Sequence, residues 1–274
     1  MEQTRNFQDF VPNVELSASE RLQIREWLRQ TPWMKELWQS ARTIYRDGRL
    51  DMRGRERYDP SHDEHHLDRI LTMSLLLALR EEARSGQAVS LDLTALVAIG
   101  HDLVVSVKSD PNRIYDTERS VEELEHIARP VLAGYVPDQA EELIAQAADK
   151  IIRCSASKGL PASGSEEMVV RDADLLDCFG MIGILRFAAV GESMHRPLVE
   201  TVDPLGLDGR PLSGSGVCVD AMIKRGLLYR DRLFTQSARE IAEQRLIDME
   251  RALEQLAQEM RPHEEMMGLF GEEE

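Results

Sequence analysis

Residues 61–80 read SHDEHHLDRILTMSLLLALR, and this stretch decides how the rest of the chain is interpreted. Its second half is an apolar run that predicts a buried helix. On that helix His66, Met73 and Leu77 share one face, and His62 lies one turn before His66. A lone histidine on an apolar face is usually a hydrogen-bonded core residue. A second histidine on the same face favours a binding site.

The composition is typical of a helical protein. Only 5% of the 274 residues are aromatic, whereas Leu, Ala, Glu, Arg and Met are plentiful, so we expect an all-α protein. The three cysteines lack CxxC spacing, the N-terminus has no apolar signal core, and no apolar run approaches the length of about eighteen residues that spans a membrane. We therefore expect a cytoplasmic protein without a membrane partner.

The net charge of -16 restricts the partners. Proteins bind long nucleic acids largely by neutralising phosphates, so we do not expect a long nucleic acid as a partner. A small anionic substrate stays open, because a metal ion and a few Arg or Lys side chains can reverse the field locally.

Polar stretches rich in Gly and Pro separate the apolar segments. We expect helices at residues 17–30, from Pro32 onward, and at residues 61–85, 91–105, 117–133, 137–155 and 165–190, followed by a long C-terminal helix. The expected organisation is N-terminal helices (1–54) packed on a core (55–200), a flexible loop (201–216), a C-terminal helical part of the same domain (217–262) and a disordered tail (263–274). The loop is either a lid over a pocket or a plain surface loop. The last helix carries an apolar stripe from Ala242 to Met260, which packs on the core or pairs across a homodimer.

Two further clusters carry titratable residues on apolar segments. His101 and Asp102 follow the run ALVAIG, and residues 169–177 read VVRDADLLD with Asp174 on the apolar face of the predicted helix. Burying an ionised carboxylate is costly unless something pairs with it. Asp174 could cap a helix or pair with an arginine such as Arg186, but one divalent metal ion explains all the clusters together. The nitrogen and oxygen donors, without thiolates, suit Mn²⁺, Fe²⁺, Mg²⁺, Co²⁺ or Zn²⁺ and argue against a purely structural zinc.

The ordered pattern His…His-Asp…Asp resembles the HD superfamily of metal-dependent phosphohydrolases. The resemblance is strongest to a bacterial, nucleotide pyrophosphatase-like subgroup with an opening HDxxHxxRV motif and a later DADRLD motif followed by Gly-x-Ile-Gly-Ile. Here residues 62–70 read HDEHHLDRI, residues 172–177 read DADLLD, and residues 180–184 read GMIGI. The HD dipeptide alone is a weak signal, but the ordered set is specific and spans roughly residues 55–250.

The resemblance implies a single-domain HD-type helical bundle with a long C-terminal helix that hydrolyses a small phosphate ester or anhydride, with a nucleotide as the expected substrate, and that uses one divalent metal ion. Manganese is the first choice, and Mg, Fe, Co, Ni and Zn are alternatives. The implied metal ligands are His66, His101, Asp102 and Asp174, with Asp172 and Asp177 around them. The implied catalytic residues are His62, Asp63, Glu64 and Asp102, and the candidates for binding phosphate are Arg69, Lys150, Arg153 and Lys158. For Arg69, pairing with a carboxylate is an equal alternative.

The chain departs from the subgroup pattern at three places. Leu175 stands where relatives carry Arg or Lys, Cys154 stands where the subgroup often has His, and the segment after Asp102 offers Asp116 and Glu118 where relatives with two metals have a further His. These departures keep two alternatives open. One is a non-catalytic metal- or nucleotide-binding regulatory module, and the other is an HD-fold di-iron oxygenase.

Overall fold

The computed structural model describes residues 14–47, 61–106, 110–154, 161–213 and 216–271, and within these ranges its regular elements are all helices. The helices are α1 (Ala18–Gln30), α2 (Trp33–Asp47), α3 (Glu64–Ser85), α4 (Leu91–Gly100), the 3-10 helix η2 (Pro111–Tyr115), α5 (Asp116–Tyr135), α6 (Ala140–Cys154), α7 (Ser165–Leu176), α8 (Gly180–Ser193), α9 (Cys218–Arg230) and α10 (Gln236–Gly271). The prediction of an all-α protein is therefore confirmed. Across these ranges no helix combines the length and the apolar character needed to cross a membrane.

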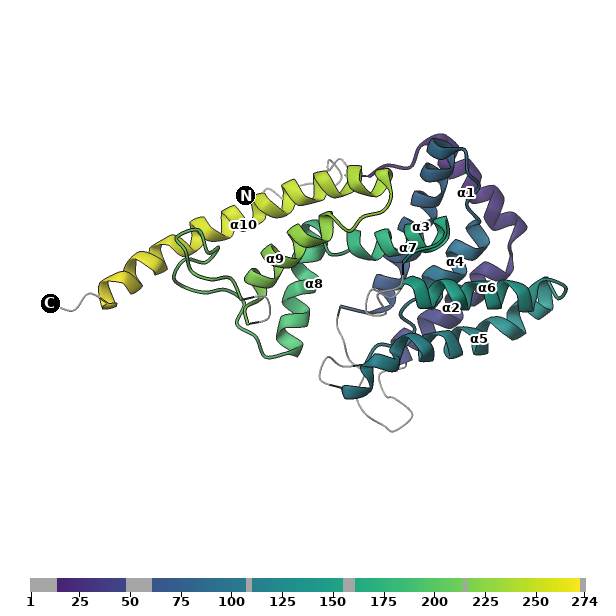
Figure 1. Cartoon of the computed structure of the whole chain (residues 1–274), viewed down its shortest axis with the longest axis horizontal. Helices are drawn as coiled ribbons and strands as arrows, with labels where there is room; N and C mark the ends of the chain where they lie inside the picture. The colour runs from purple at the N-terminus through teal and green to yellow at the C-terminus, as the bar shows by residue number, and fades with distance from the viewer. Residues whose placement is uncertain (1–13, 48–60, 107–109, 155–160, 214–215, 272–274) are drawn as a thin grey trace, which may run out of the picture.

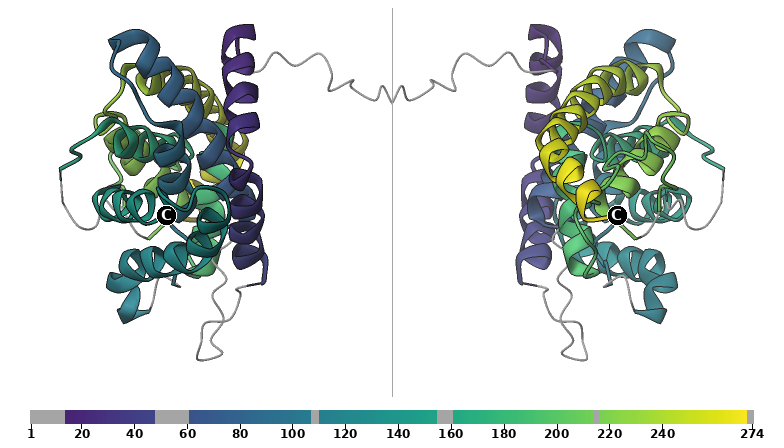
Figure 2. Two further views of the ribbon diagram at one scale, coloured as in Figure 1. Left: turned by 90° about the vertical axis from the view of Figure 1, so that its right-hand side faces the viewer. Right: turned by 90° about the vertical axis from the view of Figure 1, so that its left-hand side faces the viewer.

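The helices α1 to α7 form a bundle, and α10 runs from that bundle along α9 and α8 (Figure 1). Figure 2 shows α1 and α2 stacked along one side of the molecule. At the centre of the bundle, α3 packs against both α4 and α7, and α4 also packs against α6. This arrangement brings the helices that carry the predicted site residues into direct contact.

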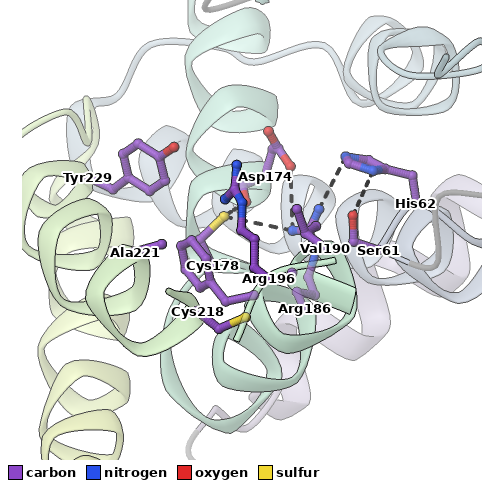
Figure 3. A pocket seen from close by; sticks show the side chains of 12 residues that line it. Ser61, His62, Asp174, Cys178, Arg186, Val190, Arg196, Cys218, Ala221 and Tyr229 are labelled. Carbon is purple, nitrogen blue, oxygen red and sulfur yellow. Dashed lines mark hydrogen bonds and ion pairs between the residues drawn. The ribbon is translucent and has the colours of Figure 1, made fainter. Parts of the chain in front are cut away.

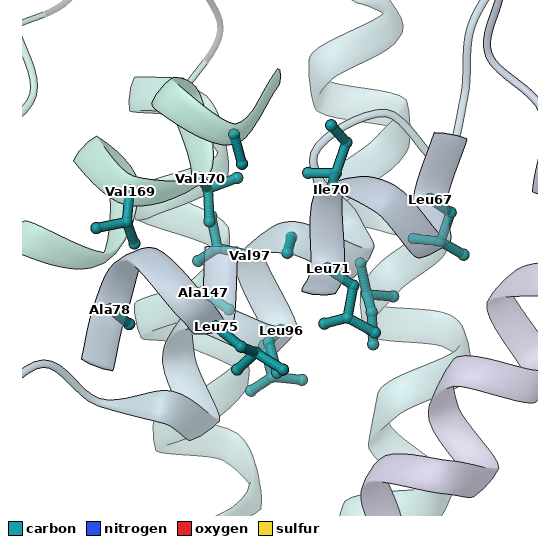
Figure 4. Packing of buried hydrophobic residues seen from close by; sticks show 14 of the residues in the cluster. Leu67, Ile70, Leu71, Leu75, Ala78, Leu96, Val97, Ala147, Val169 and Val170 are labelled. Atoms are coloured by element: carbon teal, nitrogen blue, oxygen red, sulfur yellow. The ribbon is translucent and has the colours of Figure 1, made fainter. Parts of the chain in front are cut away.

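The core of the bundle lies where α3, α4, α6 and α7 meet (Figure 4). Every residue of α4 from Leu93 to Gly100 is buried, as expected for a helix that is apolar on all sides. A side chain at Gly100 would collide with Ile151 and Leu124. Glycine at the end of α4 therefore lets α5 and α6 approach closely, directly before His101.

The predicted C-terminal end of α4 is wrong. Helix α1 has the expected capping box between Ser17 and Glu20, but α4 ends at Gly100 instead of continuing to residue 105. The chain leaves the helix there because the N–H of Val104 donates to the hydroxyl of Ser120 at 2.9 Å. This bond to a side chain replaces the backbone bond that a continued helix would form.

The predicted helix over residues 165–190 is two helices. Helix α7 ends at Leu176, and α8 begins at Gly180, whose φ of +68° lies in the left-handed region that favours glycine. After this break the chain turns, so Met181 and Leu185, which a continuous helix would place on the buried face with Asp174, are 55% and 66% exposed.

The C-terminal helix packs on its own chain along its first half. Ala242, Leu246 and Met249 are buried, and the next turns pack against a small cluster shared by α8 and α9. The expected disordered tail from residue 263 is wrong as far as Gly271, because α10 continues to that residue. Glu264 accepts a hydrogen bond from the N–H of Asp203 at 2.6 Å, which ties this part of the helix to the preceding loop. A homodimer stays a prediction.

The described part of the loop over residues 201–216 is held by two buried aspartates. The carboxylate of Asp203 accepts hydrogen bonds from the backbone N–H groups of Leu207, Asp208 and Arg210 at 2.6–3.1 Å. The guanidinium of Arg210 in turn donates to both carboxylate oxygens of Asp220 at 2.8 and 2.9 Å. These bonds fasten the loop to α9, and a role as a lid stays a prediction.

We expect Asp220→Asn to lower the free energy of unfolding by about 1–3 kcal/mol at pH 7, because Asp220 is fully buried in its pair with Arg210. Hydrogen bonds from Arg210 hold the pKa of the Asp220 carboxyl below its ordinary value. The contribution is therefore complete above the unfolded pKa of about 4 and declines as the pH falls below it. Urea unfolding of both forms at pH 7 and pH 3 measures the difference, with the exposed Asp149→Asn as control. A difference that grows at pH 3 would contradict this ion pair.

Candidate metal centre

The predicted ligands lie in the first turn of α3, directly after α4 and in the last turn of α7. The carboxylate of Asp63 caps α3 by accepting a hydrogen bond from the backbone N–H of His66 at 2.8 Å. The hydroxyl of Tyr45 on α2 donates to the backbone carbonyl of Asp102 at 2.7 Å, just after α4. These bonds position the two helix ends. Asp63, expected to be catalytic, therefore has a capping role.

The structure brings His66, His101 and Asp174 together. One donor atom from each of the three residues lies within 4.8 Å of the others. The distance between Nε2 of His66 and Oδ1 of Asp174 is 3.7 Å. Donor atoms on one divalent ion lie roughly 3–4 Å apart, since each is about 2.1 Å from the ion. This group therefore has the dimensions of a metal site.

A second group, formed by His62, His66 and Asp102, has the same dimensions. Oδ2 of Asp102 lies 3.6 Å from Nε2 of His62 and 3.7 Å from Nε2 of His101. Asp102 thus lies between histidines of both groups. The four residues that the resemblance implies as ligands form one cluster, with His62 at its edge.

Two histidines each direct one unpartnered ring nitrogen into this cluster. Nδ1 of His66 lies 2.8 Å from Oδ2 of Asp177, and Nδ1 of His101 lies 2.7 Å from the carbonyl oxygen of Ala98. Both contacts place the proton on Nδ1, so each Nε2 carries a free lone pair. Within the described residues, neither buried Nε2 atom has a hydrogen-bond partner. Such atoms beside carboxylates fit a metal ion.

Asp177 holds this arrangement in place. Its buried carboxylate accepts hydrogen bonds from Nε and Nη2 of Arg69 at 2.7 and 3.0 Å, and Nη1 of Arg186 lies 3.1 Å away. Burial alone would raise the pKa of Asp177, but hydrogen bonds from His66 and Arg69 and the charge of Arg186 lower it well below its ordinary value. Burial lowers the pKa of His66, which favours the neutral imidazole that metals bind.

Two other expected site residues lie away from the cluster. Asp172, expected around the ligands, instead accepts hydrogen bonds from the backbone N–H groups of Phe234 and Thr235 at 2.9 and 2.7 Å. It therefore anchors the start of α10. Glu64, expected to be catalytic, lies 3.5 Å from Arg42 on α2. Successive side chains on a helix point about 100° apart. Asp172 and Glu64 are therefore close in sequence to a candidate ligand but point away from the site.

The cations that we expected to bind phosphate have carboxylate partners. The pairs are Arg69 with Asp177 at 2.7 Å, Lys150 with Glu166 and Glu167 at 2.9 Å each, and Arg153 with Asp149 at 2.9 Å. For Arg69, this contact agrees with the alternative of pairing with a carboxylate. Lys158 lies outside the described residues.

Two arginines that the sequence analysis did not assign to phosphate binding line a pocket of about 170 Å³ beside the cluster (Figure 3). Asp174 and His62 also line this pocket, and Arg186 and Arg196 reach it from α8 and the segment after it. Nη1 of Arg186 lies 3.8 Å from Asp174, and Nη2 lies 3.4 Å from Nε2 of His62. Nε of Arg186 is buried without a partner among the described residues. The pocket can therefore receive an anion next to the candidate metal ligands.

We expect Asp177→Asn to weaken Mn²⁺ binding by about 10- to 100-fold, because His66 loses the carboxylate that orients it. Asp172→Asn is the matched control, since Asp172 is equally buried on the same segment but contacts Phe234 and Thr235. The control should leave Mn²⁺ affinity unchanged within about threefold while lowering thermal stability. Titration of Mn²⁺ followed by electron paramagnetic resonance measures both affinities. Equal losses in the two variants would show that Asp177 has no special link to the centre.

No protein-family model matches the chain, and its sequence matches no curated protein. Its three-dimensional structure does match solved structures. Bacillus subtilis YpgQ in complex with ADP has 19% identity and a TM-score of 0.55, with coverage of 81% of this chain and 97% of YpgQ. An HD-superfamily hydrolase from Bacillus thuringiensis has 20% identity and a TM-score of 0.54, with coverage of 85% and 98%. The Lin1889 protein from Listeria innocua has 21% identity and a TM-score of 0.54, with coverage of 83% and 97%.

At these identities the likeness concerns the fold. The match extends over nearly the full length of each solved structure, and the solved structures include an HD-superfamily hydrolase. The chain therefore has an HD-type helical fold.

Proposed function

We propose that this protein is a metal-dependent phosphohydrolase that acts on a small phosphate ester or anhydride of the nucleotide class. One observation carries the proposal: the buried Nε2 atoms of His66 and His101 have no hydrogen-bond partner in the described part of the chain and lie beside the carboxylates of Asp174 and Asp102. The shared fold with an HD-superfamily hydrolase supports the reaction class. That YpgQ was crystallised with ADP supports a nucleotide as the substrate class.

We further propose that one divalent ion binds to His66, His101, Asp102 and Asp174. The set contains nitrogen and oxygen donors without a thiolate, which is compatible with Mn²⁺ as the first choice and with Mg²⁺, Fe²⁺, Co²⁺, Ni²⁺ or Zn²⁺ as alternatives. When bound, such an ion activates water and polarises a phosphoryl oxygen.

The protein's own residues supply the remaining functions. The guanidinium of Arg186 provides a fixed positive charge beside Asp174 and so can hold a phosphoryl group at the centre. His62 lies at the edge of the cluster, with Nδ1 2.9 Å from the hydroxyl of Ser61 and Nε2 3.6 Å from Asp102. Its Nε2 atom is therefore placed to accept a proton from attacking water.

A regulatory module is the second candidate. Leu175 packs against the core, and the thiol of Cys154 donates to the carbonyl of Glu167 at 3.5 Å, so neither residue supplies a charge or a metal ligand. Burial also raises the pKa of Cys154, which keeps the thiol protonated. Against this candidate, Arg186 supplies the cation that Leu175 does not. A cytoplasmic location stays a prediction.

We expect His101→Asn to abolish stoichiometric Mn²⁺ binding and nearly all turnover, because it removes one of the two unpartnered Nε2 atoms. Metal content by mass spectrometry and hydrolysis of a nucleotide panel with added Mn²⁺ test this expectation, with His126→Asn on the exposed side of α5 as control. Metal binding without hydrolysis of any nucleotide or generic phosphodiester by the unaltered protein would favour the regulatory module. Two irons per chain would favour the oxygenase.

We expect His62→Gln to retain the metal but to lower kcat by about 10²–10⁴-fold, the range of a single general base. Glutamine keeps a polar group near Asp102 and Arg186 but cannot take a proton at neutral pH. The Mn²⁺ content of the variant gives the independent readout, because the loss of a base that is not a ligand should leave this content unchanged. Loss of bound metal together with activity would instead make His62 a ligand.

A further inference from the structure

The pocket beside the candidate metal centre extends away from it toward α9. Besides Asp174 and His62, the apolar side chains of Phe187, Val190 and Ala221 line it, and Figure 3 shows Ala221 and Tyr229 on α9 at the side away from His62. Its volume of about 170 Å³ exceeds what one bound water or one small ion requires. A ligand that fills this pocket therefore has atoms beyond the reacting group.

The two arginines of the pocket differ in how their charges are compensated. The guanidinium of Arg186 lies 3.1 Å from Asp177 and 3.8 Å from Asp174. Arg196 lines the same pocket but has no carboxylate within ion-pair distance among the described residues. In a chain with 49 acidic and 33 basic residues, an arginine left uncompensated inside a pocket attracts an anion.

The backbone fixes the position of Arg196 before any ligand binds. At the end of α8, the N–H groups of Met194 and Arg196 both donate to the carbonyl of Gly191, at 3.0 and 2.9 Å. Between them, His195 has a φ of +53°, a left-handed conformation that costs free energy in a residue other than glycine. The N–H of Cys218, which begins α9, donates to the carbonyl of Pro197 at 3.0 Å. The backbone of Arg196 is thus fixed on its N-terminal side by the turn that contains His195 and on its C-terminal side by the bond between Pro197 and Cys218.

We propose that Arg196 binds a second anionic group of the substrate, namely a phosphoryl group bonded to the one that reacts beside Asp174 and Arg186. Arg196 is then a specificity-determining residue, because it favours substrates with adjacent phosphoryl groups over monophosphates. A guanidinium suits this role because its planar set of N–H donors matches two phosphate oxygens at once. This inference rests on the proposed function, since it takes the reacting phosphoryl group to lie at the metal centre.

The test compares the binding of two non-reacting probes to the Mn²⁺-loaded protein by calorimetry: imidodiphosphate, which has two linked phosphoryl groups, and orthophosphate, which has one. The unaltered protein should bind imidodiphosphate more tightly. Arg196→Gln should weaken imidodiphosphate binding by about 10- to 100-fold, the usual effect of losing a charge-assisted hydrogen bond, and orthophosphate binding by less than about threefold. Arg196→Lys should restore part of the preference, because it keeps the charge but loses the paired donors.

Arg251→Gln is the matched control, since this arginine is 73% exposed on α10 away from the pocket. Mn²⁺ affinity and thermal stability, measured on every variant, show that the protein remains folded and loaded. The inference is overturned if Arg196→Gln still prefers imidodiphosphate over orthophosphate. It is also overturned if the unaltered protein shows no such preference.

Hydrolysis assays separate this inference from the proposed function. Turnover of nucleotides with an unchanged probe preference in Arg196→Gln refutes only the role of Arg196. The opposite result is also possible: the unaltered protein hydrolyses no phosphate ester or anhydride, and Arg196→Gln loses the preference for imidodiphosphate. That result refutes the proposed reaction but supports an anion-binding role for Arg196.

Discussion

The carboxylate of Asp177 is the contact on which the rest of the site depends. It lies directly after α7 and joins that helix to His66 and Arg69 of α3 and to Arg186 of α8. A buried carboxylate is stable only if its charge is matched and its oxygens are hydrogen-bonded. Here two guanidinium groups and an imidazole meet that requirement, so the end of α7 is fixed relative to both neighbouring helices. The chain turns directly after this contact, at Gly180 with its left-handed φ of +68°, and α8 leaves in a new direction.

This structural contact also sets the chemistry of the centre. Asp177 accepts a hydrogen bond from Nδ1–H of His66, which leaves Nε2 facing Asp174, whereas Nδ1–H of His101 donates to the backbone carbonyl of Ala98 with the same result. A carboxylate partner makes an imidazole a stronger donor to a metal than a carbonyl does. The two histidines are therefore equivalent in orientation and differ in the group that holds the Nδ1 proton, a carboxylate for His66 and a backbone carbonyl for His101.

The local parts of this picture could be predicted from the sequence, and the long-range parts could not. Helical spacing placed His66 on the buried face of α3, and the capping box of α1 could be read from Ser17 and Glu20. The pairing of Arg69 with Asp177 spans 108 positions, so the sequence left phosphate binding and a carboxylate contact as equal alternatives for Arg69. The break before α8 was missed because apolar spacing continues through residues 170–185 as if the helix did. Because we assumed a continuous helix, we could not predict that Arg186 and Arg196 line the pocket beside the cluster.

The two candidate ligand groups share His66, and this limits how many ions the centre can hold. Nδ1 of His66 is occupied by Asp177, so only Nε2 is available, and one ring nitrogen binds one ion. The group with His101 and Asp174 and the group with His62 and Asp102 therefore cannot each hold an ion through His66 at the same time. The guanidinium of Arg186, 3.4 Å from Nε2 of His62, adds a positive charge where a second ion would have to lie. Repulsion between like charges at such distances is large in a partly buried site. The charge of Arg186 therefore disfavours a second cation beside His62, which agrees with the proposal of a single ion.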